Sequence, residues 1–191
     1  MRVIAGRLRG RRLKSPTWSG LRPTSDRLRE TLFNVLGSRV QGARVLDLCA
    51  GTGAVGIEAL SRGAVHVTLV DADPRACRLA AANLAACGLD EGYAIVRSTV
   101  DEAGARLTTP FDIVFVDPPY DDPAFGRWVA AAAALVAPEG LLVVEHARTR
   151  DCGAAAGRLA RVRALRSGDS ALSFYRWPDE ARTPPGQEQQ P

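Results

Sequence analysis

Residues 45–56 read VLDLCAGTGAVG, and this stretch decides the fold. The apolar run 45–48 predicts a buried strand, and Gly51, Gly53 and Gly56 that follow it fit the pattern G-x-G-x-x-G. Asp71 lies 20 residues after Gly51, at the end of a second predicted strand over 66–70. Glycines let the backbone approach a ligand closely, and a carboxylate at the tip of the second strand accepts hydrogen bonds from ribose hydroxyls. The stretch therefore predicts a site for a nucleotide-like cofactor on a strand–turn–helix unit.

Strands and helices alternate on both sides of this unit. Strands are expected over 45–48, 66–70, 93–96, 113–116 and 141–144, with helices after Thr24 (as N-cap), through Glu58 to Arg62, from Asp73-Pro74 to Ala86, near 102–107, and after Asp122-Pro123. An antiparallel pair over 162–165 and 172–177 closes the chain. Short β-branched runs separated by helices indicate a mostly parallel sheet covered on both faces, so we predict an α/β, Rossmann-like fold.

Charge divides the 191 residues unevenly. The first 30 hold nine Lys or Arg against two acids, whereas the remaining 161 hold 16 cations and 19 acids. We expect a basic, RNA-binding arm over 1–23 that forms at most a small hairpin and cannot build a core, an α/β domain over 24–177, and a disordered tail over 178–191. A basic appendage on an acidic body favours a polyanionic partner.

Composition excludes several classes of protein. With 46% apolar residues the chain buries a core, and its longest apolar run, 128–137, is too short to cross a bilayer. No secretory signal is apparent, so a cytoplasmic location is expected. The four cysteines form no C-x-x-C pair and the two histidines share no ligand spacing, so no metal site is expected.

The chemistry is expected at two strand ends. Asp47 ends the first strand, where its carboxylate suits a ligand ammonium, and Asp117-Pro118-Pro119-Tyr120 follows the fourth strand. An exocyclic amine on a base is a poor nucleophile, and acceptors on Asp117 and the Pro118 carbonyl would turn its lone pair toward a methyl donor. Tyr120 offers a face for stacking. A nicotinamide dehydrogenase also needs a region that holds its substrate, and few residues outside the α/β domain remain to form one. A methyltransferase is therefore the favoured class of enzyme.

Several segments carry a resemblance to a known family. The 117–120 loop resembles the [D/N]PP[Y/F] motif of S-adenosylmethionine (SAM)-dependent amino-methyltransferases. With residues 4–13, the arginine–proline–threonine segment 21–34, 46–63 and 168–172, the chain is similar to the bacterial 16S rRNA (guanine-N2)-methyltransferases of the RsmD family over residues 2–177. The resemblance implies a class I methyltransferase sheet, SAM as cofactor, and ribosomal RNA, within a partly assembled small subunit, as substrate.

These arguments give a set of candidate residues. The catalytic candidates are Asp117, Pro118, Pro119 and Tyr120; the cofactor candidates are Asp47, Ala50, Gly51, Thr52, Gly53, Asp71, Ala72, Thr99 and Val100; the RNA candidates are Arg7, Arg9, Arg11, Arg12, Lys14 and Arg22. Thr99 and Val100 stand where related enzymes often place an acidic adenine contact. Two alternatives stay open: adenine-N6 methylation of DNA, and a non-catalytic RNA-binding assembly factor on the same fold.

Overall fold

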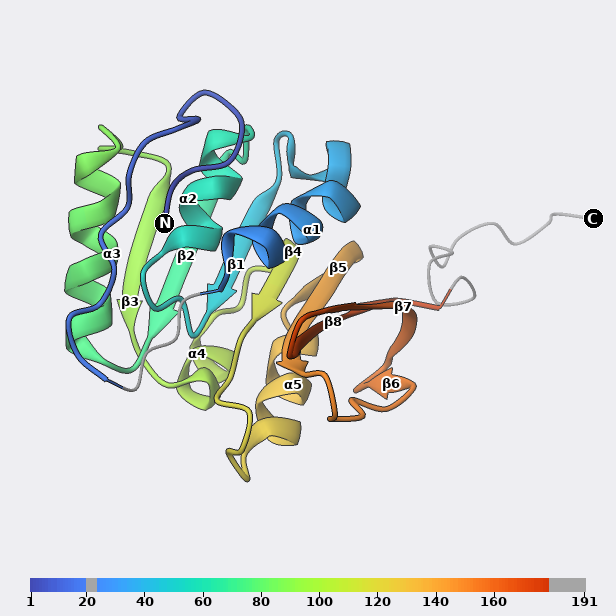
Figure 1. The fold of residues 1–191 in the computed structure, drawn as a ribbon. Coiled ribbons are helices and arrows are strands. Elements are labelled where there is room, and N and C mark those ends of the chain that lie inside the picture. Colours follow the sequence, from blue (N-terminus) through green and yellow to red (C-terminus); the bar gives the residue numbers. More distant parts are fainter. Residues whose placement is uncertain (20–23, 179–191) are drawn as a thin grey trace, which may run out of the picture.

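One eight-stranded sheet forms the centre of the computed structural model, which describes residues 1–19 and 24–178 (Figure 1). The strand order is β3-β2-β1-β4-β5-β8-β7-β6. The strands are β1 (Arg44–Leu48), β2 (His66–Asp71), β3 (Tyr93–Arg97), β4 (Phe111–Val116), β5 (Val136–Ala147), β6 (Ala155–Ala156), β7 (Leu159–Ser167) and β8 (Ser170–Arg176). Pairing is parallel from β3 to β5 and antiparallel from β5 to β6. The predicted fold class is confirmed.

Helices cover both faces of this sheet. They are α1 (Asp26–Leu36), α2 (Ala54–Ser61), α3 (Pro74–Ala86), α4 (Val100–Arg106) and α5 (Phe125–Ala133), with a 3-10 turn η1 (Gly37–Val40) after α1. Apolar side chains of α1, α2 and α3 belong to one core cluster, and those of α4 and α5 belong to a second. None of the helices within 1–19 and 24–178 is both long and apolar enough to cross a membrane.

Three helix starts test the sequence predictions. Asp73 caps α3 as predicted, accepting a hydrogen bond from the Arg75 N–H. The prediction of Thr24 as the cap of α1 is wrong by one residue: Ser25 accepts from the Leu28 N–H. Asp122 accepts from the Ala124 N–H, but α5 begins only at Phe125, so Asp122 fixes the turn before the helix rather than its first residue.

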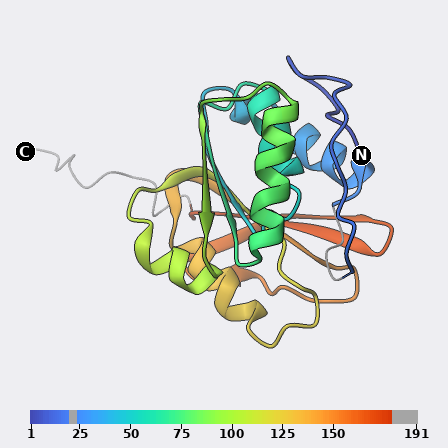
Figure 2. The ribbon, with the colours of Figure 1, turned by 90° about the vertical axis from the view of Figure 1, so that its left-hand side faces the viewer.

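The N-terminal segment corrects the idea of a separate arm. Residues 2–12 do form a small hairpin, with Arg2 bridged to Arg12, but Val3, Leu8 and Leu13 are buried in the core cluster that also contains apolar side chains of α1 and α2. The chain then runs alongside α3 (Figures 1 and 2). These three apolar residues are spaced five apart, which fits neither the helix period nor the strand period, and they stand among many cations. The sequence pattern therefore does not predict that they are buried.

A buried carboxylate attaches this hairpin to the body. Glu58 of α2 is fully buried and accepts the N–H groups of Ile4 and Ala5 at 2.7 and 3.0 Å. It also pairs with Arg62 at 2.7 Å and lies 3.8 Å from the buried Arg29 guanidinium of α1. Because a buried charge requires such partners, one carboxylate joins the hairpin, α1 and α2.

Close approach of the hairpin to α2 demands a glycine. Gly6 has φ +79°, and a Cβ there would lie 1.9 Å from the Ser61 carbonyl oxygen. The Leu8 N–H donates to the Ser61 hydroxyl at 2.9 Å and the Arg7 N–H to the Ser61 carbonyl at 2.8 Å. Only a residue without a side chain fits this approach.

We predict that Glu58→Ala lowers the free energy of unfolding by about 3–5 kcal/mol, because it leaves the buried Arg29 charge without this partner and two backbone N–H groups without an acceptor. Urea unfolding followed by circular dichroism measures the change, with Glu30→Ala at an exposed position of α1 as control. Equal losses in the two variants would show that the hairpin does not depend on Glu58.

Candidate active site

A cavity of about 720 Å³ opens at the carboxyl ends of the parallel strands. Of the residues predicted for the site, Asp47, Ala50, Gly51, Thr52, Asp71, Ala72, Thr99, Val100, Asp117, Pro118, Pro119 and Tyr120 line it. Gly53 is not among the lining residues; with φ +75° it forms the turn into α2. The structure thus brings together nearly all predicted cofactor and catalytic candidates, and their individual roles stay predictions.

Asp47 supplies a deeply buried carboxylate. It is 1% exposed, and one of its oxygens accepts the Gly56 N–H at 3.1 Å. Burial is the main reason that the pKa of Asp47 is raised to about 7; the Gly56 hydrogen bond lowers the pKa, and the nearby Asp71 and Glu145 carboxylates contribute smaller increases. A cation bound beside it would recover the energy lost by burying the charge.

Asp71 holds the glycine turn in place. One oxygen accepts the Gly51 N–H and the other the Asp73 N–H, both at 2.8 Å. The turn begins with Cys49 at φ 63°, a left-handed conformation that a non-glycine residue adopts at an energetic penalty. A carboxylate oxygen has two lone-pair sites, so Asp71 can brace the turn and still accept from a ligand hydroxyl.

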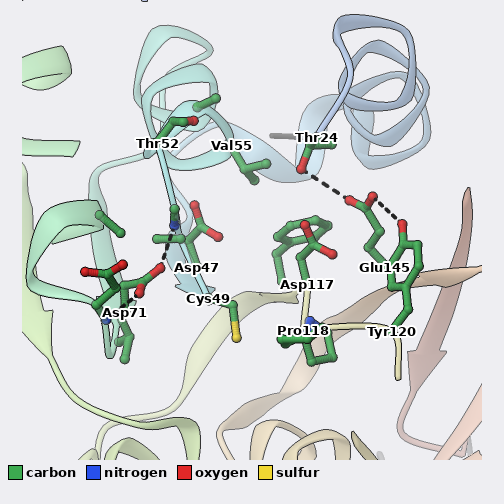
Figure 3. A pocket seen from close by; sticks show the side chains of 18 of the residues that line it. Thr24, Asp47, Cys49, Thr52, Val55, Asp71, Asp117, Pro118, Tyr120 and Glu145 are labelled. Carbon is green, nitrogen blue, oxygen red and sulfur yellow. Dashed lines mark hydrogen bonds between the residues drawn. The ribbon is translucent and has the colours of Figure 1, made fainter. Parts of the chain in front are cut away.

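The 117–120 loop lies across the cavity from Asp71 (Figure 3). The Asp117 N–H donates to the Leu48 carbonyl at 3.2 Å, which ties the loop to β1. Pro118 is buried and Pro119 is exposed. The Tyr120 hydroxyl lies 2.7 Å from the Ser170 hydroxyl and donates to Glu145 at 3.1 Å. The loop is therefore held at both ends.

Glu145 is the main residue that the sequence reasoning missed. It is 3% exposed, lines the cavity, and accepts hydrogen bonds from Tyr120 and from Thr24. Burial, followed by the Glu145 charge, raises the pKa of Tyr120, so its hydroxyl stays protonated. A signal was present: Glu145 directly follows the apolar run of a parallel strand, whose carboxyl end must lie beside that of β4.

Thr99 and Val100, the candidates near the predicted adenine region, line the cavity, and a role in adenine binding stays a prediction. Thr99 caps α4, accepting from the Glu102 N–H while Glu102 reaches back to the Thr99 N–H. Its hydroxyl is thus engaged in helix formation. Trp128 of α5, another residue missed from sequence, lines the same part of the cavity, and its indole N–H donates to Asp101 at 3.0 Å.

The basic candidates lie away from the cavity. Arg7, Arg9, Arg11, Arg12 and Lys14 are exposed and are not among the cavity-lining residues; Arg22 falls outside the described residues. Arg11 reaches the Ala86 carbonyl at the far end of α3, Lys14 lies at Asn83, and Trp18 stacks on Arg75 beside the cavity. A 13-residue helix is about 20 Å long, so the segment leads from a distant cationic surface back to the site.

The cavity is acidic, with Asp47, Asp71, Asp117 and Glu145 at the ends of four neighbouring strands. Within residues 1–19 and 24–178, no three His, Cys, Asp or Glu side chains are grouped so as to hold a metal ion. Together, this sheet order, glycine turn and set of strand-end carboxylates define a methyltransferase of the class I, Rossmann-like type.

Comparisons with known proteins identify the family. Residues 1–176 match the family described as "Conserved hypothetical protein 95", and the chain belongs to it. YlbH of Bacillus subtilis, which bears the name of an rRNA methyltransferase, is 34% identical over 92% of this chain and 98% of its own. Ribosomal RNA small subunit methyltransferase D of Escherichia coli is 47% identical, over 63% of this chain and 60% of that protein. The resemblance to the RsmD family is confirmed.

A solved structure supports the same assignment. The yhhF protein of Escherichia coli, described as a methyltransferase, superposes with a TM-score of 0.81 at 36% identity, over 92% of this chain and 96% of that one. The likeness therefore extends over nearly the whole length of both chains.

We predict that Asp47→Asn stabilises the protein increasingly as pH rises from about 4 to about 8. Because the pKa of Asp47 is raised on folding, the native state binds a proton that the unfolded state has lost, so stability falls as pH rises between about 4 and 7. A shift of about three units corresponds to roughly 4 kcal/mol at most. Thermal unfolding across this pH range measures the gain, with the exposed Asp90→Asn as control; a gain independent of pH contradicts the assignment.

Proposed function

We propose that this protein transfers a methyl group from SAM to the exocyclic N2 amine of a guanine in small-subunit (16S) ribosomal RNA. One observation carries the proposal: the glycine turn and the Asp117–Tyr120 loop line a single acidic cavity. Membership of the RsmD family and the names of the YlbH and methyltransferase D relatives support rRNA as the substrate. With ribosomal RNA as its substrate, the protein would act in the cytoplasm.

The cavity residues fit SAM. The ligand carries a sulfonium and an ammonium group, and buried carboxylates are the partners that cations require. Asp47 would hold the ammonium, Asp71 the ribose hydroxyls, and the backbone of Ala50 and Gly51 would pass close to the ligand. SAM supplies an electrophilic methyl group on sulfur. The volume of about 720 Å³ is in the range of cofactor pockets.

The 117–120 loop would orient the acceptor. The Asp117 carboxylate and the Pro118 carbonyl would accept the amine hydrogens, so that the nitrogen lone pair points at the methyl group. Two consecutive prolines restrict the loop backbone, and the Leu48 and Tyr120 hydrogen bonds fix its ends. Because N2 is paired in duplex RNA, the base must be unpaired or flipped out. Positioning of this kind is worth roughly 7–11 kcal/mol in favourable cases.

The N-terminal hairpin would bind RNA away from the reacting base. The exposed Arg7, Arg9, Arg11, Arg12 and Lys14 form a cationic surface that continues along α3 toward the cavity. Binding to phosphates gives affinity that falls with salt concentration and is independent of sequence. The hairpin would thus supply affinity while the cavity supplies chemistry.

We expect Asp117→Ala to leave SAM affinity nearly unchanged while single-turnover transfer falls by orders of magnitude, because its proposed bond is to the target amine. Asp117→Asn should lose less, since the amide oxygen still accepts a hydrogen bond. Calorimetry with SAM and transfer of labelled methyl groups to small-subunit particles lacking the modification separate the two effects. Normal rates in Asp117→Ala would remove the orienting role, and label on adenine would contradict guanine as the acceptor.

Replacing Arg9 and Arg12 together by Gln should weaken RNA binding and lower the slope of log affinity against log salt by about 0.7–0.9 for each phosphate group that is no longer neutralised. Filter binding at three salt concentrations measures the slope. Arg39→Gln with Arg106→Gln removes the same charge from exposed positions elsewhere and controls for net charge. Equal slopes in the two double variants would show that the hairpin is not the RNA surface. Full truncation is unsuitable, because Val3, Leu8 and Leu13 belong to the core.

A further inference from the structure

Two carboxylates meet on the acceptor side of the cavity. Val116 of β4 is paired with Val144 of β5 in parallel register, so Asp117 and Glu145 occupy the next position on neighbouring strands. Neighbouring strands are about 4.8 Å apart. Figure 3 shows both side chains on the Tyr120 side of the cavity, away from Asp71. The two carboxylates therefore both line the acceptor side of the cavity.

Glu145 is held in one orientation by hydroxyl groups. The Tyr120 hydroxyl donates to Oε1 at 3.1 Å and the Thr24 hydroxyl to Oε2 at 3.2 Å, and Ser170 lies 2.7 Å from the Tyr120 hydroxyl. These partners come from three distant parts of the chain. Each carboxylate oxygen has two lone-pair sites, so a ligand donor can bind in addition to the hydroxyl. A carboxylate that is 3% exposed and fixed in this way is preorganised for a donor inside the cavity.

We infer that Glu145 selects guanine by accepting its N1–H while Asp117 accepts from the adjacent N2 amine; the inference rests on the proposed function. Guanine presents two neighbouring donors on this edge, N1–H and N2–H. Adenine presents an acceptor at N1, whose lone pair would face the Glu145 carboxylate. A site built to hydrogen-bond an N–H group discriminates against an analogue with a lone pair at that position, because two acceptors then face each other.

Base analogues at the target position test this role. After the methylated nucleotide has been mapped, ligated rRNA carries guanine, 2-aminopurine or N1-methylguanine there; all three keep the 2-amino group, but only guanine has N1–H. We expect wild-type kcat/KM to fall at least tenfold on both analogues. Glu145→Gln should bring guanine and 2-aminopurine within about threefold of each other, because its amide donates to the unprotonated N1 of 2-aminopurine. Thr24→Val removes a hydroxyl partner but keeps the carboxylate, and should retain the preference for guanine.

A binding measurement gives a second readout. Fluorescence of 2-aminopurine in the same RNA, competed by guanine RNA in the presence of S-adenosylhomocysteine, yields the ratio of dissociation constants without turnover. A residue that only anchors Tyr120 would lower all rates and leave this ratio unchanged in Glu145→Gln. An unchanged ratio therefore overturns the inference.

The outcomes separate this inference from the proposed function. Absence of methyl transfer to any guanine by the wild-type protein contradicts the proposed function itself. Equal transfer to guanine and both analogues by the wild-type protein overturns the Glu145 inference alone, and this comparison needs no variant. Circular dichroism and SAM calorimetry establish that Glu145→Gln is folded before its ratio is read.

Discussion

The register of β1 with its two neighbours is the constraint on which the site depends. Leu48 is paired with Val70 on one side and with Val116 on the other, so the glycine turn, Asp71 and Asp117 all begin one position later at the same edge. A shift by one residue would turn the side chains of β1 to the opposite face and move Asp47 out of the cavity. The apolar residues that bury the sheet thus also set the spacing of its functional carboxylates.

This close spacing of carboxylates has an electrostatic cost in stability. Asp47 is buried beside other acids, and its pKa is raised accordingly. Natural cores avoid unpaired buried charge, so a concentration of carboxylates at one edge reduces stability in the absence of a cationic ligand. A cationic ligand would offset this electrostatic penalty when it binds beside the carboxylates. The penalty in the unliganded protein would therefore add to the affinity for such a ligand.

The sequence predicts local features well and long-range partners poorly. The strand before the glycine turn, the Asp73 cap and the 117–120 loop each have a pattern within about ten residues, and the structure has them where predicted. The position of Glu145 after an apolar strand is visible in the sequence, but its partners Thr24 and Tyr120 lie 121 and 25 residues away, so their hydrogen bonds to it are not. The packing of Val3, Leu8 and Leu13 was missed because a strongly basic composition masks three apolar anchors. Thr24 was mistaken for a cap because the neighbouring Ser25 is an equally good one.

The attachment of the N-terminal hairpin affects the order of folding. Glu58 accepts from the hairpin backbone, Asn83 accepts from the Lys14 N–H just after the hairpin, and Arg11 reaches Ala86; all three partners lie more than 50 residues later in the chain. Closing a loop of this length has an entropic cost, so these contacts form more slowly than a helix does. During synthesis the hairpin residues are made before α3, yet their binding surface is complete only after α3 has been made. The hairpin therefore reaches its native environment only after a much later part of the chain has been synthesised.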